Sequence, residues 1–309
     1  MNISPISFYN QKSIHPIFRA RHEFENEKIV QGKDDTIIHV SNFFREPKTD
    51  KFVQQYILDN FSKNKNIQIV SAGCSQGEEA YSYYVMLDSL QDKLNISGFD
   101  LSKKTIQDAK KGIFSLKNYE QRIIDSEYPS YLTSYERKCR EKFHAHFEPV
   151  DEDMYKQPPY CSYRRCESSI YKLKDGEKGC NFAIGNVLDL DKMYKENSID
   201  VLLFKNTLYH LTCKVDNGSL IGYRKHDDEK TIANIAKQMG KVVKKGGLVV
   251  FGENEERQHV NVDRIRCEMI KNGFEPIYLY KDPIEYRKLY DGYYNYSEPY
   301  SHVWKKVSD

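Results

Sequence analysis

The sequence has no apolar run long enough to cross a bilayer, and no part of it resembles a secretory signal peptide. We therefore expect no membrane insertion and a cytoplasmic location. Export into another cell stays open, because an uncleaved export signal would not be visible in the sequence.

The sequence also lacks an excess of charge of either sign. Its 47 lysines and arginines nearly balance 45 aspartates and glutamates, which leaves a net charge of +2. A chain so close to neutral has no general electrostatic attraction to nucleic acid or to an anionic membrane surface. We therefore expect neither as a partner.

The seven cysteines do not form a recognisable metal-binding pattern. Structural zinc sites usually contain C-x2-C knuckles, whereas Cys161 and Cys166 are five positions apart. An odd number of scattered cysteines also argues for reduced thiols rather than a disulfide framework. We predict no metal site, although His144 and His146 precede these cysteines in the same part of the chain.

Two common nucleotide-binding motifs are missing from the segment that most resembles a nucleotide site. A β-branched run at residues 67–70 passes into small residues and then into apolar positions at helical spacing. This predicts a strand, a tight loop and a helix, with Gly73 and Gly77 allowing sharp turns and close approach to a ligand. The loop contains neither G-x-G-x-x-G nor Gly-Lys-Ser/Thr, so we predict a nucleotide-like ligand that needs no phosphate cradle.

Acidic residues stand at the positions where such a ligand would lie. Glu78 begins the predicted helix, and Asp100 ends the next strand-like run at residues 95–99. A carboxylate at the tip of the second strand can accept hydrogen bonds from both ribose hydroxyls. Two acidic groups without a phosphate cradle favour a positively charged nucleoside. S-adenosylmethionine, which carries a sulfonium and an ammonium group, fits this description.

Strand and helix patterns alternate along most of the chain, which predicts an α/β fold with a mostly parallel, Rossmann-like sheet and helices on both faces. We assign residues 1–38 to a short N-terminal segment and residues 39–309 to one domain, in which about 115–181 break the alternation as an inserted small subdomain. Helices are expected over 48–62, 103–111, 227–243 and 262–272, and later strands over 199–204, 248–251 and 276–280.

The segment SAGCSQGEEAYS at residues 71–82 resembles the signature S-A-x-x-S-x-G-E-E-P-Y-S of the CheR-type chemoreceptor methyltransferases. The resemblance implies a class I S-adenosylmethionine-dependent methyltransferase fold, S-adenosyl-L-homocysteine as a product, and a role in chemotaxis through protein methylation. Four further matches follow the order of the family: SNFFRE at 41–46, GFDLS at 98–102 with AKKGIF at 109–114, GNVL at 185–188 with DVLLFKN at 200–206, and KKGGLVVFGENE at 244–255.

The resemblance also implies roles for individual residues. Ser41 stands where the family has a threonine beside the cofactor, and Arg45 stands at the family's arginine near the transferred methyl group. Asn186-Val187 falls where the family presents a residue pair to the adenine ring, and Lys205-Asn206 replaces the family's Arg-Asn. The predicted cofactor-binding residues are Ser41, Arg45, Ala72, Gly73, Glu78, Asp100, Asn186, Val187, Lys205 and Asn206.

Arg45 and His210 are the predicted catalytic residues. The sulfonium methyl group is already activated, so the protein mainly has to align the two reactants and exclude water. The Arg45 guanidinium could hold a carboxylate of the cofactor or of an acceptor glutamate in a fork. His210 takes the place of a tyrosine in the family and could accept a proton from an amine or hydroxyl acceptor, which a glutamate does not require.

Three functions therefore stay open at this point. The first, implied by the resemblance, is O-methylation of a protein glutamate, with the 115–181 insert as the part that recognises the protein substrate. The second is methylation of another protein side chain or of a small molecule, with His210 as base. The third is a cofactor-binding sensor or scaffold without activity. The segment 1–38 is too short for the helical domain with which the family docks its receptors.

Overall fold

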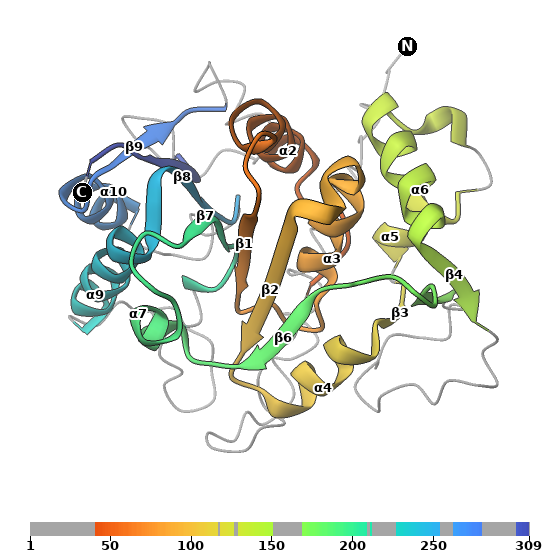
Figure 1. The fold of residues 1–309 in the computed structure, drawn as a ribbon, viewed down its shortest axis with the longest axis horizontal. Helices are drawn as coiled ribbons and strands as arrows, with labels where there is room; N and C mark the ends of the chain where they lie inside the picture. Colours follow the sequence, from red (N-terminus) through yellow and green to blue (C-terminus); the bar gives the residue numbers. More distant parts are fainter. Residues whose placement is uncertain are drawn as a thin grey trace, which may run out of the picture.

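Two separate β-sheets form the framework of the protein (Figure 1). The computed structural model describes residues 41–116, 118–126, 129–150, 169–208, 211, 227–253, 262–279 and 301–308. The larger sheet has seven strands in the order β6-β2-β1-β7-β8-β10-β9. Their bounds are β1 Ile67–Ala72, β2 Leu94–Asp100, β6 Asn181–Ile184, β7 Ile199–Phe204, β8 Val243–Phe251, β9 Phe274–Ile277 and β10 Val303–Lys306.

The larger sheet is mostly parallel, as the sequence predicts. Strands β6, β2, β1, β7 and β8 pair in parallel, whereas β10 runs antiparallel to both of its neighbours, β8 and β9. From β1 the chain builds outward through β2 and β6, and then returns to add β7 on the other side of β1. This reversal creates a topological switch point between β1 and β7, where open α/β sheets bind their ligands at the carboxyl ends of the strands.

Helices cover both faces of this sheet, because alternate strand residues belong to two different cores. Ile69 and Val201 lie in one core, and their neighbours Val70 and Leu202 lie in the other. Strands that are buried on both faces are typical of parallel sheets. The predicted Rossmann-like α/β architecture is thereby confirmed. The first core includes α2 Pro47–Phe61, α3 Glu78–Met86 and α4 Lys103–Lys111, and the second includes α7 Leu190–Met193, α9 Asp227–Val242 and α10 Val262–Lys271.

Most predicted boundaries agree with the structure. Helix α4 begins where the Ser102 hydroxyl accepts the Thr105 N–H at 3.3 Å, and it ends at Gly112, which has a φ of +62°. Strand β8 differs, because it begins at Val243 rather than at residue 248. Val243 pairs with Ile199 before the register shifts, so the lysines and glycines predicted as a helix stop lie inside the strand. Strand β9 likewise begins at Phe274, two positions before the prediction.

The second sheet lies largely within the segment predicted as an insert, about 115–181, although its first strand already begins at Ile113. It has three antiparallel strands in the order β3-β5-β4, and the Phe143 ring of α6 stacks on Phe147 at 4.6 Å between centroids. Phe43 meets Phe143 edge-on at 5.1 Å, which ties this unit to the main core. The exact domain boundaries stay a prediction. The elements are β3 Ile113–Ser115, α5 Asn118–Ile124, α6 Ser134–His146, β4 Phe147–Val150 and β5 Ile170–Leu173.

None of the helices in the described residues has the length and apolar character needed to cross a membrane. Within the same residues, no three His, Cys, Asp or Glu side chains are grouped so that they could hold a metal ion. Cys161 and Cys166 lie outside the described residues.

Candidate active site

The loop between β1 and α3 lies at the switch point and turns sharply. Gly73 has a φ of +72° and Gly77 a φ of +98°, backbone conformations that glycine adopts at little cost. The N–H groups of Gly73 and Cys74 both donate to the Phe99 carbonyl, at 2.8 and 3.0 Å, and so fix the loop to the end of β2. Glu78 then begins α3, and its side chain is buried at the helix N-terminus. The predicted sequence of strand, tight loop and helix is observed.

Gly73 is closely packed against the end of β7. The Thr207 hydroxyl donates to the Ala72 carbonyl at 2.9 Å and so joins the ends of β1 and β7. A Cβ atom at Gly73 would lie 2.6 Å from the Thr207 Oγ1 atom, closer than real contacts allow. The loop can therefore pack against Thr207 at the end of β7 only because residue 73 has no side chain.

We expect Gly73→Ala to lower the free energy of unfolding by more than the same substitution does at another glycine with a positive φ. Gly246→Ala is the matched control, because Gly246 has a φ of +83° but open space around a Cβ. The control should cost roughly 1–2 kcal/mol, and Gly73→Ala at least about 1 kcal/mol more because Thr207 must move. Urea unfolding of both variants measures the difference, and equal losses would contradict the crowding at Gly73.

Asp100 lies at the carboxyl end of β2, next to this loop. Its Oδ2 atom accepts the Ser75 N–H and its Oδ1 atom accepts the Ser102 N–H, both at 3.1 Å. Each carboxylate oxygen has two lone pairs, so each keeps one acceptor position for a further donor. The carboxylate is thus held in a fixed orientation and can still accept two hydroxyl groups.

Asn186 lies beside Asp100 because β6 pairs with β2. The Gly185 N–H donates to the Asp100 carbonyl at 3.0 Å, and the Asn186 side chain accepts the Leu188 N–H at 2.9 Å. Asn186 therefore caps a short 3₁₀ helix, Val187–Asp189, in which Val187 is buried. The amide nitrogen of Asn186 is still available as a donor.

Exposed apolar side chains surround this end of the sheet. Leu101 follows Asp100, Ile184 is the residue opposite Asp100 on β6, and Leu188 lies on the 3₁₀ helix; all three are exposed. Sequence reasoning missed them, because an apolar residue at a strand end is usually interpreted as core. Their exposure leaves apolar surface that a flat aromatic ligand could cover.

Lys205 and Asn206 follow directly after β7. The side chain of Lys205 is 5% exposed, forms an ion pair with Asp50 and lies 3.6 Å from the nearer Glu46 oxygen. Burial alone would lower the pKa of Lys205, but Asp50 and Glu46 outweigh it and raise the pKa above its usual range. Lys205 is therefore a charged anchor that holds the start of α2 against the end of β7.

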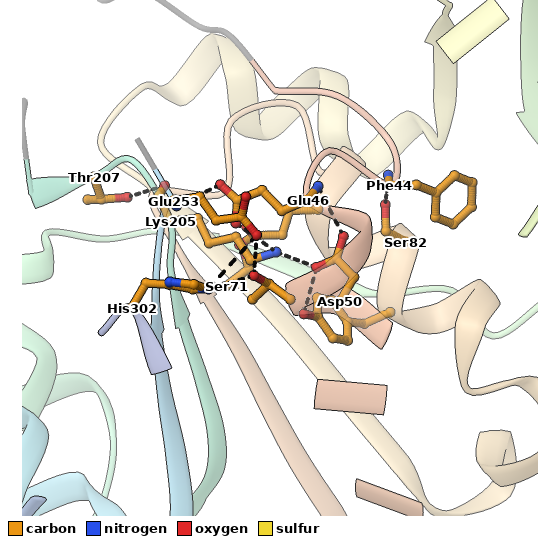
Figure 2. A network of polar contacts seen from close by, with 12 residues as sticks. Phe44, Glu46, Asp50, Ser71, Ser82, Lys205, Thr207, Glu253 and His302 are labelled. Atoms are coloured by element: carbon orange, nitrogen blue, oxygen red, sulfur yellow. Dashed lines mark hydrogen bonds and ion pairs between the residues drawn. The ribbon is translucent and has the colours of Figure 1, made fainter. Parts of the chain in front are cut away.

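Further polar residues extend this network to β8 and β10 (Figure 2). Glu46 accepts the Glu253 N–H at 3.0 Å, and the Thr49 hydroxyl donates to the Glu253 carboxylate. The Thr49 oxygen also lies 2.7 Å from the Nε2 atom of His302, which directly precedes β10. We call this set, with Asp50 and Lys205, the buried network. Its members other than Lys205 were not predicted as site residues.

Acidic groups outnumber basic ones around the buried network. Glu46, Asp50, Glu79 and Glu253 face Lys205 and the charge of Arg45. Desolvation raises the pKa of Glu46 to about 7, with Lys205 and Arg45 opposing the shift and Glu253 and Asp50 adding to it. Desolvation also raises the pKa of Glu79. The two cations thus partly offset the cost of burying these acidic side chains.

We expect Glu46→Gln to change how stability depends on pH. Glu46 titrates near 7 when folded and near 4.5 in a model compound, so its stabilising protonated form is lost as the pH rises through 7. Gln mimics that form, so the variant should gain stability relative to the wild type from pH 5 to pH 8, by up to about 3 kcal/mol. Glu141→Gln, at an exposed position of α6, is the control.

The pKa of His302 moves in the opposite direction. The pH dependence of stability that His302 causes must therefore be removed from the comparison. Burial lowers the pKa of His302 to about 4, so folding gains stability as the pH rises from 4 to 6.5. Because both proteins contain His302, denaturant unfolding should be reported as the difference between variant and wild type. A difference that stays constant from pH 5 to 8 would contradict a titrating Glu46.

Arg45 lies on the turn that leads into α2 and is partly exposed. Its positive charge opposes the raised pKa values of Glu46 and Glu79. Ser41 is buried at the start of the same turn. His210 lies outside the described residues, so the structure does not test its predicted role.

Two buried amides lack a hydrogen-bond partner among the residues that the structure describes. These are the side chains of Asn42 and of Asn206, which are 3% and 9% exposed. Asn206 has a φ of +54° and packs against Gly252, where a Cβ would lie 2.7 Å from the amide nitrogen. Buried amides without partners are uncommon in folded proteins, and a bound ligand is one way to satisfy them.

These observations fit S-adenosylmethionine. The site offers a carboxylate for a diol at Asp100, exposed apolar surface beside it, and an unsatisfied amide at Asn206. It also has the buried Glu78 carboxyl group at the start of α3, directly after the loop. Gly73 allows the loop beside these groups to pack closely against the end of β7.

Residues 39–156 match the family described as "CheR methyltransferase, SAM binding domain". The chain is 33% identical over 119 residues to the chemotaxis protein methyltransferase of Borreliella burgdorferi. The aligned region covers 35% of this chain and 40% of that relative. The chain thus spans less than half of the relative's length.

Among solved structures, a SAM-dependent methyltransferase from Methanosarcina mazei is 14% identical, with 74% of this chain and 72% of that chain covered and a TM-score of 0.31. The CurJ carbon methyltransferase is 11% identical, with 84% and 54% covered and a TM-score of 0.40. The resemblance to the CheR-type methyltransferases is confirmed by the family match over residues 39–156, and with it S-adenosyl-L-methionine as the predicted cofactor.

Proposed function

We propose that the chain is an S-adenosylmethionine-dependent methyltransferase that converts a glutamate side chain of a protein into its methyl ester. The observation that carries the proposal is the position of Arg45, which lies on the turn into α2 and inside the region that matches the CheR methyltransferase family. Its side chain is partly exposed there, whereas the Lys205 side chain is buried in an ion pair with Asp50. We infer that Arg45 is the cation that orients an acceptor carboxylate, because a guanidinium can hold a carboxylate in a fork.

In this proposal the cofactor is held along the carboxyl ends of four strands. Asp100 accepts the ribose hydroxyls, and Asn186 and Val187 contact the adenine. Glu78, at the start of α3, offers negative charge to the methionine end. When bound, the cofactor supplies a methyl group that the sulfonium makes electrophilic. We propose that Ala72 and Gly73, at the end of β1, and Asn206, after β7, line the site between these two groups.

The acceptor carboxylate needs no base. One of its oxygens forms a bond to the methyl carbon with its own lone pair, while the carbon–sulfur bond breaks and both of its electrons go to sulfur. An ionised carboxylate releases no proton in this step, so Arg45 only has to orient it and keep it ionised. S-adenosylhomocysteine is the second product. The segment that holds β3, β4 and β5 is the proposed surface for the protein substrate.

Transfer of a labelled methyl group tests this proposal. The purified chain is incubated with methyl-labelled S-adenosylmethionine and a lysate of its own cells, and the labelled protein is treated with mild base. We expect label on protein that base releases as methanol, because carboxylate esters hydrolyse under these conditions. Label that resists base would instead indicate an amine or similar acceptor. Tight binding of the cofactor without any transfer would indicate a binding module.

A further inference from the structure

The signature at residues 71–82 contains more polar residues than the cofactor site uses. Gly73 lies against Thr207 at the end of β7 and Glu78 begins α3, but Ser82 lies one helical turn after Glu78. The Ser82 side chain is 2% exposed, and neither the fold nor the proposed cofactor contacts require a hydroxyl at this position.

The Ser82 hydroxyl joins two parts of the site that are far apart in the sequence. It donates to the Glu78 carbonyl at 2.7 Å, and it accepts the Phe44 N–H at 3.0 Å (Figure 2). Glu78 is the proposed contact for the methionine end of the cofactor, and Phe44 immediately precedes Arg45. A single side chain therefore connects the cofactor helix to the turn that carries the predicted catalytic arginine.

The turn around Phe44 has a shape that the chain would not adopt without support. Phe44 has a φ of +52°, in the left-handed region that bulky residues rarely occupy. Such conformations persist where the surroundings determine them strongly, and they gather at functional sites. The neighbouring Phe43 N–H donates to the Glu120 carboxylate at 2.7 Å, and Phe44 itself is buried.

The buried network holds the other side of the same turn. Glu46 accepts the Glu253 N–H and faces Lys205, so the residue after Arg45 is fixed to the ends of β7 and β8. Arg45 thus lies between two anchored residues, with Ser82 holding the residue before it and the network holding the residue after it.

We propose that Ser82 is a positioning residue that sets the location of Arg45 relative to the cofactor helix. The proposal rests on the proposed function, in which Arg45 orients the acceptor. If the hydroxyl is removed, the Phe44 N–H loses this acceptor and the strained turn can relax. Small displacements of an orienting group lower the rate of transfer far more than they lower the affinity for the cofactor.

Ser82→Ala tests the proposal, because alanine favours helix and so spares α3. We expect the Phe44 amide to exchange with solvent at least about tenfold faster, as measured by NMR on the full chain. We expect the turnover number at saturating S-adenosylmethionine to fall about tenfold or more. The dissociation constant of S-adenosylhomocysteine, measured by calorimetry, should change less than about threefold.

Two further variants complete the design. Ser82→Thr keeps a hydroxyl that can bond to the carbonyl four residues earlier, so turnover should return to within about threefold of the wild type. Ser89→Ala, at an exposed position shortly after α3, should change none of the three measurements.

Three results would overturn the proposal: unchanged exchange at Phe44 in Ser82→Ala, turnover within twofold of the wild type, or cofactor affinity that falls in parallel with turnover. If the wild type itself transfers no methyl group, the proposed function fails. The exchange rate at Phe44 then still decides whether Ser82 holds the turn.

Discussion

Asp100→Ala is expected to weaken the binding of S-adenosylmethionine about 100-fold or more. The carboxylate is held by two backbone N–H groups and keeps one acceptor position on each oxygen. Two hydrogen bonds from ribose hydroxyls to a charged group contribute about 1.5–3 kcal/mol each, and a 100-fold loss corresponds to about 2.7 kcal/mol. Calorimetric titration measures the change directly.

Two variants separate the lost ribose contact from damage to the loop. Asp100→Asn keeps one acceptor oxygen and should lose about tenfold in affinity, less than the alanine variant. Asp92→Ala, at an exposed position outside the site, should bind as the wild type does. Because Asp100 also accepts the Ser75 and Ser102 N–H groups, urea unfolding should be measured alongside. Near-normal affinity in a folded Asp100→Ala protein would count heavily against the assigned contact.

Lys205→Met is expected to lower the free energy of unfolding at pH 8 by about 3–5 kcal/mol, the cost of breaking a buried ion pair by removing one partner. Asp50 and Glu46 would lose the cation that they face. The loss should be smaller at pH 5.5, because the pKa of Glu46 is about 7 and its protonation relieves the repulsion. Urea unfolding at both pH values measures the effect.

The matched controls for Lys205 come from the same network and from the surface. Adding Asp50→Asn to Lys205→Met removes one of the uncompensated charges, so the double variant should be more stable than Lys205→Met alone. Lys237→Met, at an exposed position of α9, should stay within about 0.5 kcal/mol of the wild type. A Lys205→Met protein that loses less than 1 kcal/mol at pH 8 would contradict the anchoring role of Lys205.

The parts of the site that could be predicted from the sequence are those with a local signal. Gly73 and Gly77 mark a tight turn between a β-branched run and a helical period, and the structure has that turn. Ser102 and Gly112 mark the ends of α4 in the same way. Each of these features depends on residues within one turn of each other, so one sequence is enough to predict them.

The buried network could not be predicted because its contacts join distant positions. Thr49 reaches Glu253 across 204 positions and His302 across 253 positions. His302 directly precedes β10, and its contact with Thr49 depends on β10 lying next to β8. That order of strands leaves no periodic trace in the sequence, whereas a helix or a strand does.

The start of strand β8 could not be predicted for a similar reason, because it depends on a neighbouring strand. Gly246-Gly247 after a helix is a common stop signal, and sequence reasoning ended the helix before these residues and began the strand after them, at residue 248. In the structure Val243 already pairs with Ile199, and the glycines fall where the register shifts. A bulge depends on the neighbouring strand, so local turn chemistry alone gave the wrong start of β8.

Calorimetric titration of the wild-type chain with S-adenosylmethionine and with S-adenosylhomocysteine is the most direct test of the site. We expect both to bind at one site per chain, with dissociation constants below about 1 mM, the upper end of typical substrate affinities. The absence of binding heat with either compound, confirmed at more than one temperature, would contradict a nucleoside site at the carboxyl ends of β1, β2, β6 and β7.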